Sequence, residues 1–130
     1  MLFKTDLLVP PTATVANPAT ETIKLCEGHI SHSFLLFPAG CAGLVWVQVW
    51  LNGYQLIPWE RGEWLRGDDH IIQDNGRYEI PGEPRLLVIK GYADGAALNH
   101  TIQVGVEVTP KQMEETTVPP EQLLREMGLM

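Results

Sequence analysis

The 130-residue chain has few cysteines, no long apolar run and no pattern typical of a signal peptide. These three features argue against a disulfide-rich domain, a membrane-spanning protein and signal-directed secretion. Cys26 and Cys41 alone do not make the disulfide framework of a small secreted domain, so we expect two reduced, packed thiols. No apolar run approaches the ~18 residues that a transmembrane helix needs, so we expect no membrane partner. The N-terminus lacks the basic start and apolar core of a signal peptide, so signal-directed secretion is not expected.

Basic residues are also scarce: nine Lys and Arg stand against sixteen Asp and Glu, for a net charge of −7. Binding to a phosphate backbone depends on clustered Lys and Arg, so nucleic acid is not expected as a partner. The apolar content of 45% and the charged content of 19% are those of a globular chain. A length of 130 residues suffices for one domain with its own core.

Helical periodicity is missing before residue 110, whereas apolar and polar residues alternate repeatedly. The clearest example is Leu44–Leu51, in which successive side chains of a strand point to opposite faces. On one face Trp46 and Trp50 either lie under a covering layer or contact a partner. The other face is aliphatic and is expected in the core: Val45, Val47, Val49 and Leu51.

Asn52-Gly53 is the strongest hairpin signal and joins this strand to Tyr54–Ile57, because both residues tolerate the positive φ of a type I′ turn. Further strands are expected at residues 22–26, 30–37, 70–73, 77–80, 85–92 and 99–109, and a short strand at 64–65 is left open. Seven or eight short strands with turn signals every 8–12 residues predict an all-β fold, an antiparallel, jelly-roll-like β-sandwich. The predicted core also holds Leu87, Ile89, Ile102, Val104 and Val106, with Leu86 and Val88 replacing the first two if that strand is shifted by one residue.

The predicted organisation is an extended N-terminal arm over residues 1–20, the sandwich over 21–109 and a C-terminal tail over 110–130. Prolines 10, 11 and 18 favour an extended strap, because proline cannot donate to a sheet ladder. Residues 119–128 predict a helix of roughly two turns, too short to be stable alone. Both ends carry apolar residues that need a surface, so we predict them as assembly contacts: Leu7, Leu8, Val9, Leu123, Leu124 and Met127.

Catalytic and metal-binding patterns are not found. Asp68 and Asp69 precede His70, but adjacent strand residues point apart, so we interpret them as a solvated turn and leave open whether they bind an ion. No Ser or Cys lies in a nucleophile elbow, and the glycines do not form a phosphate loop. We therefore expect a protein that is not an enzyme and has no cofactor and no metal.

Tryptophans offer the better functional signal. Trp59 and Trp64 lie in a charged, glycine-containing segment, and Tyr54 follows the hairpin turn nearby. Such rings either stack on sugars or anchor a protein interface. A carbohydrate-binding β-sandwich with a sugar ligand is therefore one of the two functions that the sequence leaves open.

The other function comes from a resemblance. The turn and strand over residues 37–45, the Gly91-Tyr92 pair and Asn99-His100-Thr101 resemble small β-sandwich proteins of tailed-virus particles. The likeness lies in the layout of residues 20–109, preceded by a proline-rich arm and followed by a tail. It implies a structural subunit of the virion, such as a head decoration or capsid-associated protein, assembled in the host cytoplasm. Its partners would be copies of itself or other particle subunits, and no catalytic residue carries over.

Overall fold

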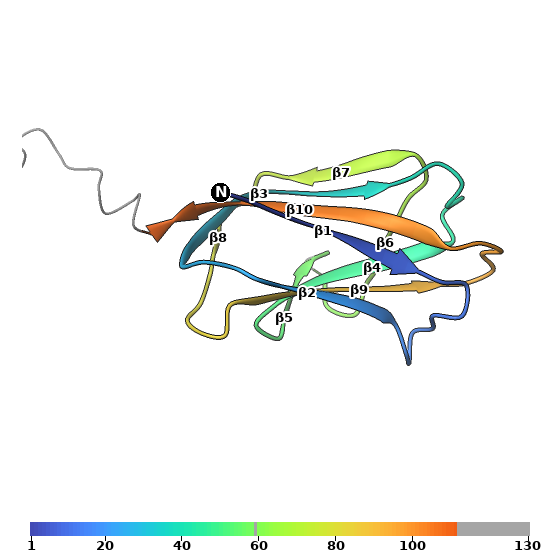
Figure 1. The fold of residues 1–130 in the computed structure, drawn as a ribbon, viewed down its shortest axis with the longest axis horizontal. Helices are drawn as coiled ribbons and strands as arrows, with labels where there is room; N and C mark the ends of the chain where they lie inside the picture. The colour runs from blue at the N-terminus through green and yellow to red at the C-terminus, as the bar shows by residue number, and fades with distance from the viewer. Residues whose placement is uncertain (59, 112–130) are drawn as a thin grey trace, which may run out of the picture.

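Two antiparallel sheets stacked face to face form a β-sandwich, seen in a computed structural model that describes residues 1–58 and 60–111 (Figure 1). Sheet A has the order β1 (Leu2–Val9), β10 (His100–Pro110), β3 (Gly28–Phe37) and β7 (His70–Asp74), and β8 (Tyr78–Glu79) also pairs with β3. Sheet B has the order β2 (Ala19–Lys24), β9 (Leu86–Ala93), β4 (Val45–Leu51) and β5 (Tyr54–Ile57), and β6 (Leu65–Arg66) also pairs with β4.

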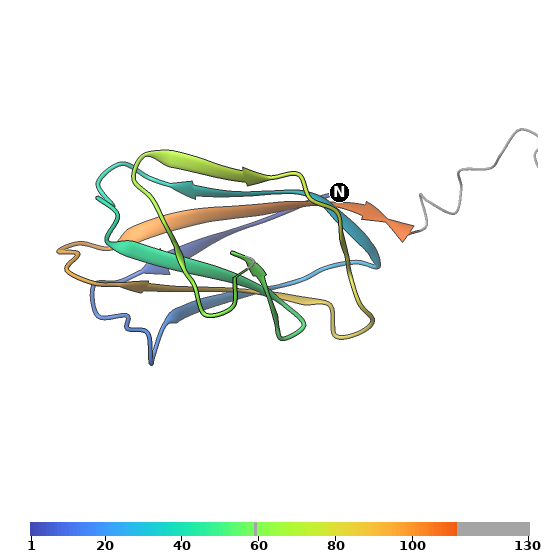
Figure 2. The same ribbon diagram turned by 180° about the vertical axis from the view of Figure 1, so that it is seen from behind.

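Most pairings join strands that are far apart in the sequence. The first strand, β1, pairs with the last, β10, and β2 pairs with β9. The segment between β6 and β7 passes from the layer of sheet B to that of sheet A, as the view from behind shows (Figure 2). The chain therefore wraps around the core instead of building each sheet from a continuous meander.

The core lies between the two sheets and contains the residues that the alternation predicted. All eight predicted positions of β4, β9 and β10 are at most 1% exposed, which confirms them: Val45, Val47, Val49, Leu87, Ile89, Ile102, Val104 and Val106. Leu51 is also buried, at 4%. Leu86 and Val88 are half-buried, so the alternative register of that strand is wrong.

The prediction of an N-terminal arm is wrong for Leu2–Val9, because these residues form β1 in sheet A. The strand pairs with β10 over its whole length, from Leu2 opposite Glu107 to Val9 opposite His100. Leu7 and Val9 are 1% and 0% exposed. The residues of this strand alternate between exposed and more buried positions. The prolines that suggested a strap come after the strand, in the connection to β2.

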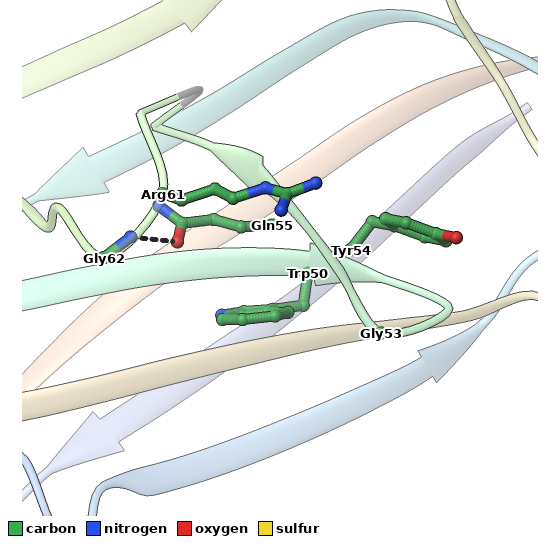
Figure 3. A pocket seen from close by; sticks show the side chains of 6 residues that line it. All are labelled: Trp50, Gly53, Tyr54, Gln55, Arg61 and Gly62. Carbon is green, nitrogen blue, oxygen red and sulfur yellow. Dashed lines mark hydrogen bonds between the residues drawn. The ribbon is translucent and has the colours of Figure 1, made fainter.

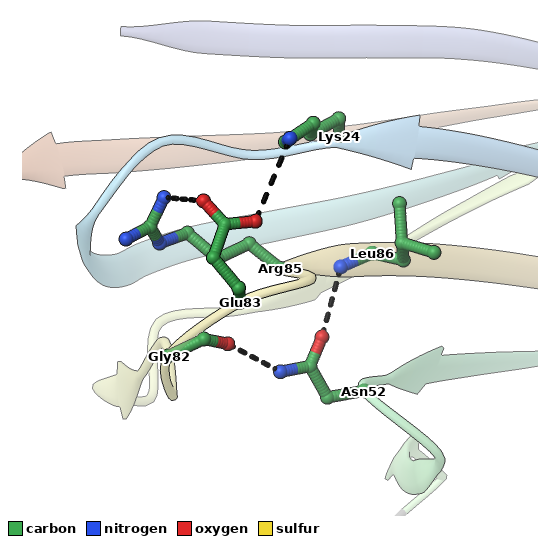
Figure 4. Close-up of polar contacts among 6 residues, drawn as sticks. All are labelled: Lys24, Asn52, Gly82, Glu83, Arg85 and Leu86. Atoms are coloured by element: carbon green, nitrogen blue, oxygen red, sulfur yellow. Dashed lines mark hydrogen bonds and ion pairs between the residues drawn. The ribbon is translucent and has the colours of Figure 1, made fainter.

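The hairpin between β4 and β5 is confirmed. Asn52 and Gly53 have φ angles of 48° and 86°, both in the left-handed region that this turn needs. The Asn52 side chain also ties the hairpin to the segment before β9: its Nδ2 donates to Gly82 O at 2.8 Å, and its Oδ1 accepts from Leu86 N at 2.9 Å (Figure 4). Two exposed ion pairs lie beside this bridge, from Glu83 to Lys24 and to Arg85.

Candidate functional site

The outer face of sheet B carries a cluster of aromatic rings. The indole of Trp46 stacks on Tyr92 of the neighbouring strand, with centroids 5.1 Å apart and planes 6° apart. Trp64 approaches the same ring edge-on, with centroids 4.7 Å apart at 89°. Trp50 lies further along β4, and all four side chains are half-buried. The rings of Trp46, Trp64 and Tyr92 therefore pack against one another on the outside of the sandwich.

Cations lie over these rings. Arg66 Cζ is 5.7 Å from the Trp46 ring centroid, and Lys90 Nζ is 4.5 Å from the Trp50 ring centroid. A cation over an indole face is attracted by the negative charge of the π-system. We call this surface the outer aromatic face and define it by six residues: Trp46, Trp50, Trp64, Arg66, Lys90 and Tyr92.

Neither cation of this face forms an ion pair with a carboxylate in the described part of the chain. Lys24, Arg77, Arg85 and Lys111 each form an ion pair with a carboxylate. The described cations without such a pair are Arg61, Arg66, Lys90 and Lys4, and of these only Lys4 lies in sheet A. A chain with a net charge of −7 thus keeps uncompensated positive charge around one aromatic surface.

Two glutamines hold the segment between β5 and β6 against sheet B. The carbonyl oxygens of Pro58, Glu60 and Glu63 lie 2.8–3.0 Å from Gln55 Nε2. Gln55 Oε1 accepts from the backbone of Gly62 at 2.9 Å. Gln48, which is 4% exposed, donates its Nε2 to Glu63 O and accepts from Trp50 Nε1. The backbone of this segment is therefore positioned by side chains of the sheet.

A pocket of about 300 Å³ opens between this segment and the β4–β5 hairpin. Figure 3 shows the Trp50 indole on one side of Gln55, with Arg61 reaching across Gln55 toward the strand that carries Tyr54. A second hollow of about 390 Å³ lies beside it and adds Glu60 to the shared residues Tyr54, Gln55 and Arg61. We call the first the hairpin pocket; it is lined by Trp50, Gly53, Tyr54, Gln55, Arg61 and Gly62.

The residues predicted as ligand or interface contacts differ in exposure, and not all of them are on the surface. Tyr54 is 69% exposed and lines the hairpin pocket. Trp64 is half-buried against Tyr92, whereas Trp59 lies outside the described residues. Leu7 and Val9 are core residues, so their prediction as interface contacts is wrong, and Leu8 between them is 53% exposed. The remaining predicted positions, and the predicted helix over 119–128, lie outside the described residues: Leu123, Leu124 and Met127.

The acidic turn at residues 68 and 69 has a structural role in the fold. Asp68 Oδ1 accepts from the backbone N–H groups of Gly40 and Ala42, both at 3.0 Å, and so holds the turn before β4. Burial, and to a smaller extent the charge of Asp68, raise the pKa of the Cys41 thiol, so this thiol stays neutral. Cys26 and Cys41 are both free. No three His, Cys, Asp or Glu residues of the described part are grouped so that they could hold a metal ion.

No sequence pattern indicated Arg61, Arg66 or Lys90 as residues of the site. Lys90 lies opposite Gln48 because β9 pairs with β4. Arg66 lies opposite Trp46 because β6 also pairs with β4. The local signals were the alternation that put Trp46 and Trp50 on one face and the position of Tyr54 directly after the hairpin turn. The cations over the rings depend on strand pairings that no local pattern encodes.

Among the described residues, no helix is long and apolar enough to cross a membrane. No protein-family model matches the chain, and no curated protein and no solved structure matches it.

Proposed function

We propose that this chain is a non-enzymatic assembly subunit of the kind found in virus particles, and that copies of it associate through the outer aromatic face. The observation that carries the proposal is the gathering of Arg66 and Lys90 over the half-buried rings of Trp46 and Trp50, with no carboxylate paired to either cation. Trp, Tyr and Arg are the residues most enriched among the energetic anchors of protein interfaces.

The strand order supports a jelly-roll topology as part of the proposal. In a jelly roll the chain is wound as two Greek keys. The first strand therefore lies beside the last strand, and the second strand lies beside the next-to-last strand. The orders β1-β10-β3-β7 and β2-β9-β4-β5 are consistent with that winding. Jelly rolls occur in viral capsid proteins and in lectins, so the topology agrees with both functions that the sequence left open. The surface chemistry favours assembly.

Charge complementarity points to a second copy of the chain as the partner. The outer aromatic face is cationic, whereas the chain as a whole has a net charge of −7, so an acidic surface elsewhere on another copy is its natural complement. A contact between two different surfaces is heterologous, and it generates rings or open arrays. Rings and arrays are the arrangements that shells and joining segments of particles require. The tail residues Leu123, Leu124 and Met127 remain proposed as additional contacts.

The experiment is the native mass of the purified chain, followed over protein and salt concentration. We expect oligomers that dissociate as salt rises, because salt screens charges near the surface. Arg66→Glu should abolish association. Lys4→Glu is the matched control, since it makes the same charge change at another exposed, unpaired cation in sheet A. A wild-type chain that stays monomeric, or equal loss of association in both variants, would contradict the proposal.

A further inference from the structure

We infer that the hairpin pocket is a binding site for a carboxylate-bearing sugar, a function beyond assembly through the outer aromatic face, with which the pocket shares Trp50. The inference rests on three features that meet in one hollow of about 300 Å³: an aromatic wall, an unpaired guanidinium and a pre-positioned loop. That volume is at the lower end of the range for ligand pockets and suits a ligand the size of a single sugar ring.

The aromatic side of the pocket is formed by the Trp50 indole (Figure 3). Trp50 is held in place because its Nε1 donates to Gln48 Oε1 at 3.0 Å, and Gln48 is itself bonded to the loop. Tyr54, which is 69% exposed, lines the rim of the pocket with its ring directed away from Trp50 and Arg61 (Figure 3). The C–H-rich face of a sugar ring stacks on such surfaces, and a rigid aromatic wall loses little conformational entropy when the ligand binds.

The charged side of the pocket is Arg61. Its side chain makes no ion pair and no hydrogen bond within the described residues, although Glu60 is its neighbour in the chain. A guanidinium offers a planar fork of donors that matches a carboxylate in a bidentate pair. Arg61 therefore selects for a carboxylate on the ligand. Glu60, in the adjoining hollow, can accept hydrogen bonds from sugar hydroxyl groups.

The loop that carries Arg61 is organised before any ligand arrives. The single side-chain amide of Gln55 contacts the carbonyl oxygens of Pro58, Glu60 and Glu63 and the backbone N–H of Gly62. Gly53 and Gly62 leave the pocket open, because a Cβ at either position would have no atom within 4 Å. A site held in this way does not have to be ordered by the ligand, and this reduces the cost of binding.

The test is a titration with D-glucuronate followed by NMR, with D-glucose and acetate as matched probes that lack the carboxylate or the ring. We expect saturable binding of glucuronate, markedly weaker binding of the other two, and a shift of the Trp50 indole N–H signal that Trp46 does not show. Arg61→Gln should weaken glucuronate binding at least about tenfold, since hydrogen bonds to a charged group are among the strong ones. The affinity of Arg61→Lys for glucuronate should lie between those of the wild type and of Arg61→Gln.

Arg66→Gln is the control for net charge, because Arg66 lies over Trp46 and does not line the pocket. It should leave glucuronate binding unchanged. Absence of saturable binding, equal affinity for glucose and glucuronate, or equal weakening in the two arginine variants would overturn the inference. Each of these results is independent of the oligomeric mass, so failure of the sugar site and failure of the proposed assembly are distinguishable.

Discussion

The Trp46 indole lies flat on the Tyr92 ring, 5.1 Å away with the two planes 6° apart, across the paired strands β4 and β9. Trp64 then meets Tyr92 edge-on, so one tyrosine joins two strands of sheet B to the segment that precedes β6. Burial, with a smaller effect of the Asp94 charge, raises the pKa of Tyr92 and keeps its ring neutral. This ring is the centre of the outer aromatic face.

Replacing Tyr92 tests that role. Tyr92→Leu removes two aromatic pairs, each of which contributes about 0.5–1.5 kcal/mol beyond area burial, so the free energy of unfolding should fall by about 1–3 kcal/mol. Tyr92→Phe keeps both ring contacts and should stay within about 0.5 kcal/mol of the wild type. Urea unfolding measures both. Equal destabilisation by Leu and Phe would show that the hydroxyl, and not the stacked ring, matters.

Deletion of residues 1–9 should unfold the protein, because these residues include β1 of sheet A. Full burial of Leu7 and Val9 contributes about 1.5–3 kcal/mol each, and the total stability of a domain is only about 5–15 kcal/mol. A chain that ends at Lys111 is the control, since it retains all ten described strands. Circular dichroism and thermal melting distinguish the two. A deletion variant that melts cooperatively like the wild type would restore the arm interpretation.

Gly91→Ala should destabilise the fold by overpacking. A Cβ at Gly91 would lie 2.8 Å from both Leu7 Cδ2 and Val9 Cγ2, between the two sheets. Extra methyl groups in a filled core cost about 1–3 kcal/mol. Gly82→Ala is the matched control, because its Cβ would meet no atom within 4 Å and its φ is not positive. Chemical denaturation should show a loss for Gly91→Ala and almost none for Gly82→Ala; the reverse order would contradict the assigned packing.

Stability should fall as the pH rises from about 10 to about 12. The hydrogen bond from Tyr78 to Asp74, together with burial, raises the pKa of Tyr78 to about 12. Because the folded pKa lies above the ordinary value of about 10, the stabilisation is complete below pH ~10 and is lost as the pH rises through the folded value. Tyr78→Phe removes the hydrogen bond, so its stability should depend less on pH across this window. Urea midpoints at several pH values provide the comparison.

The sequence by itself determined the local elements. Alternation placed Val45, Val47 and Val49 in the core, and Asn52-Gly53 defined the hairpin, because both signals depend on side-chain direction and on φ within a few residues. Leu2–Val9 was predicted as part of an arm from the prolines that follow it, whereas its residues alternate between exposed and buried in the sheet.

The tertiary structure alone decided which strands pair and what the outer surface presents. Val9 is buried because β1 lies beside β10 and faces Gly91 of the other sheet, a relationship between residues more than eighty positions apart. Arg61 and Trp50 line one pocket because Gln55 folds the intervening segment back over sheet B. Contacts of this kind arise when distant segments close around a common core, and no pattern within one segment carries that information.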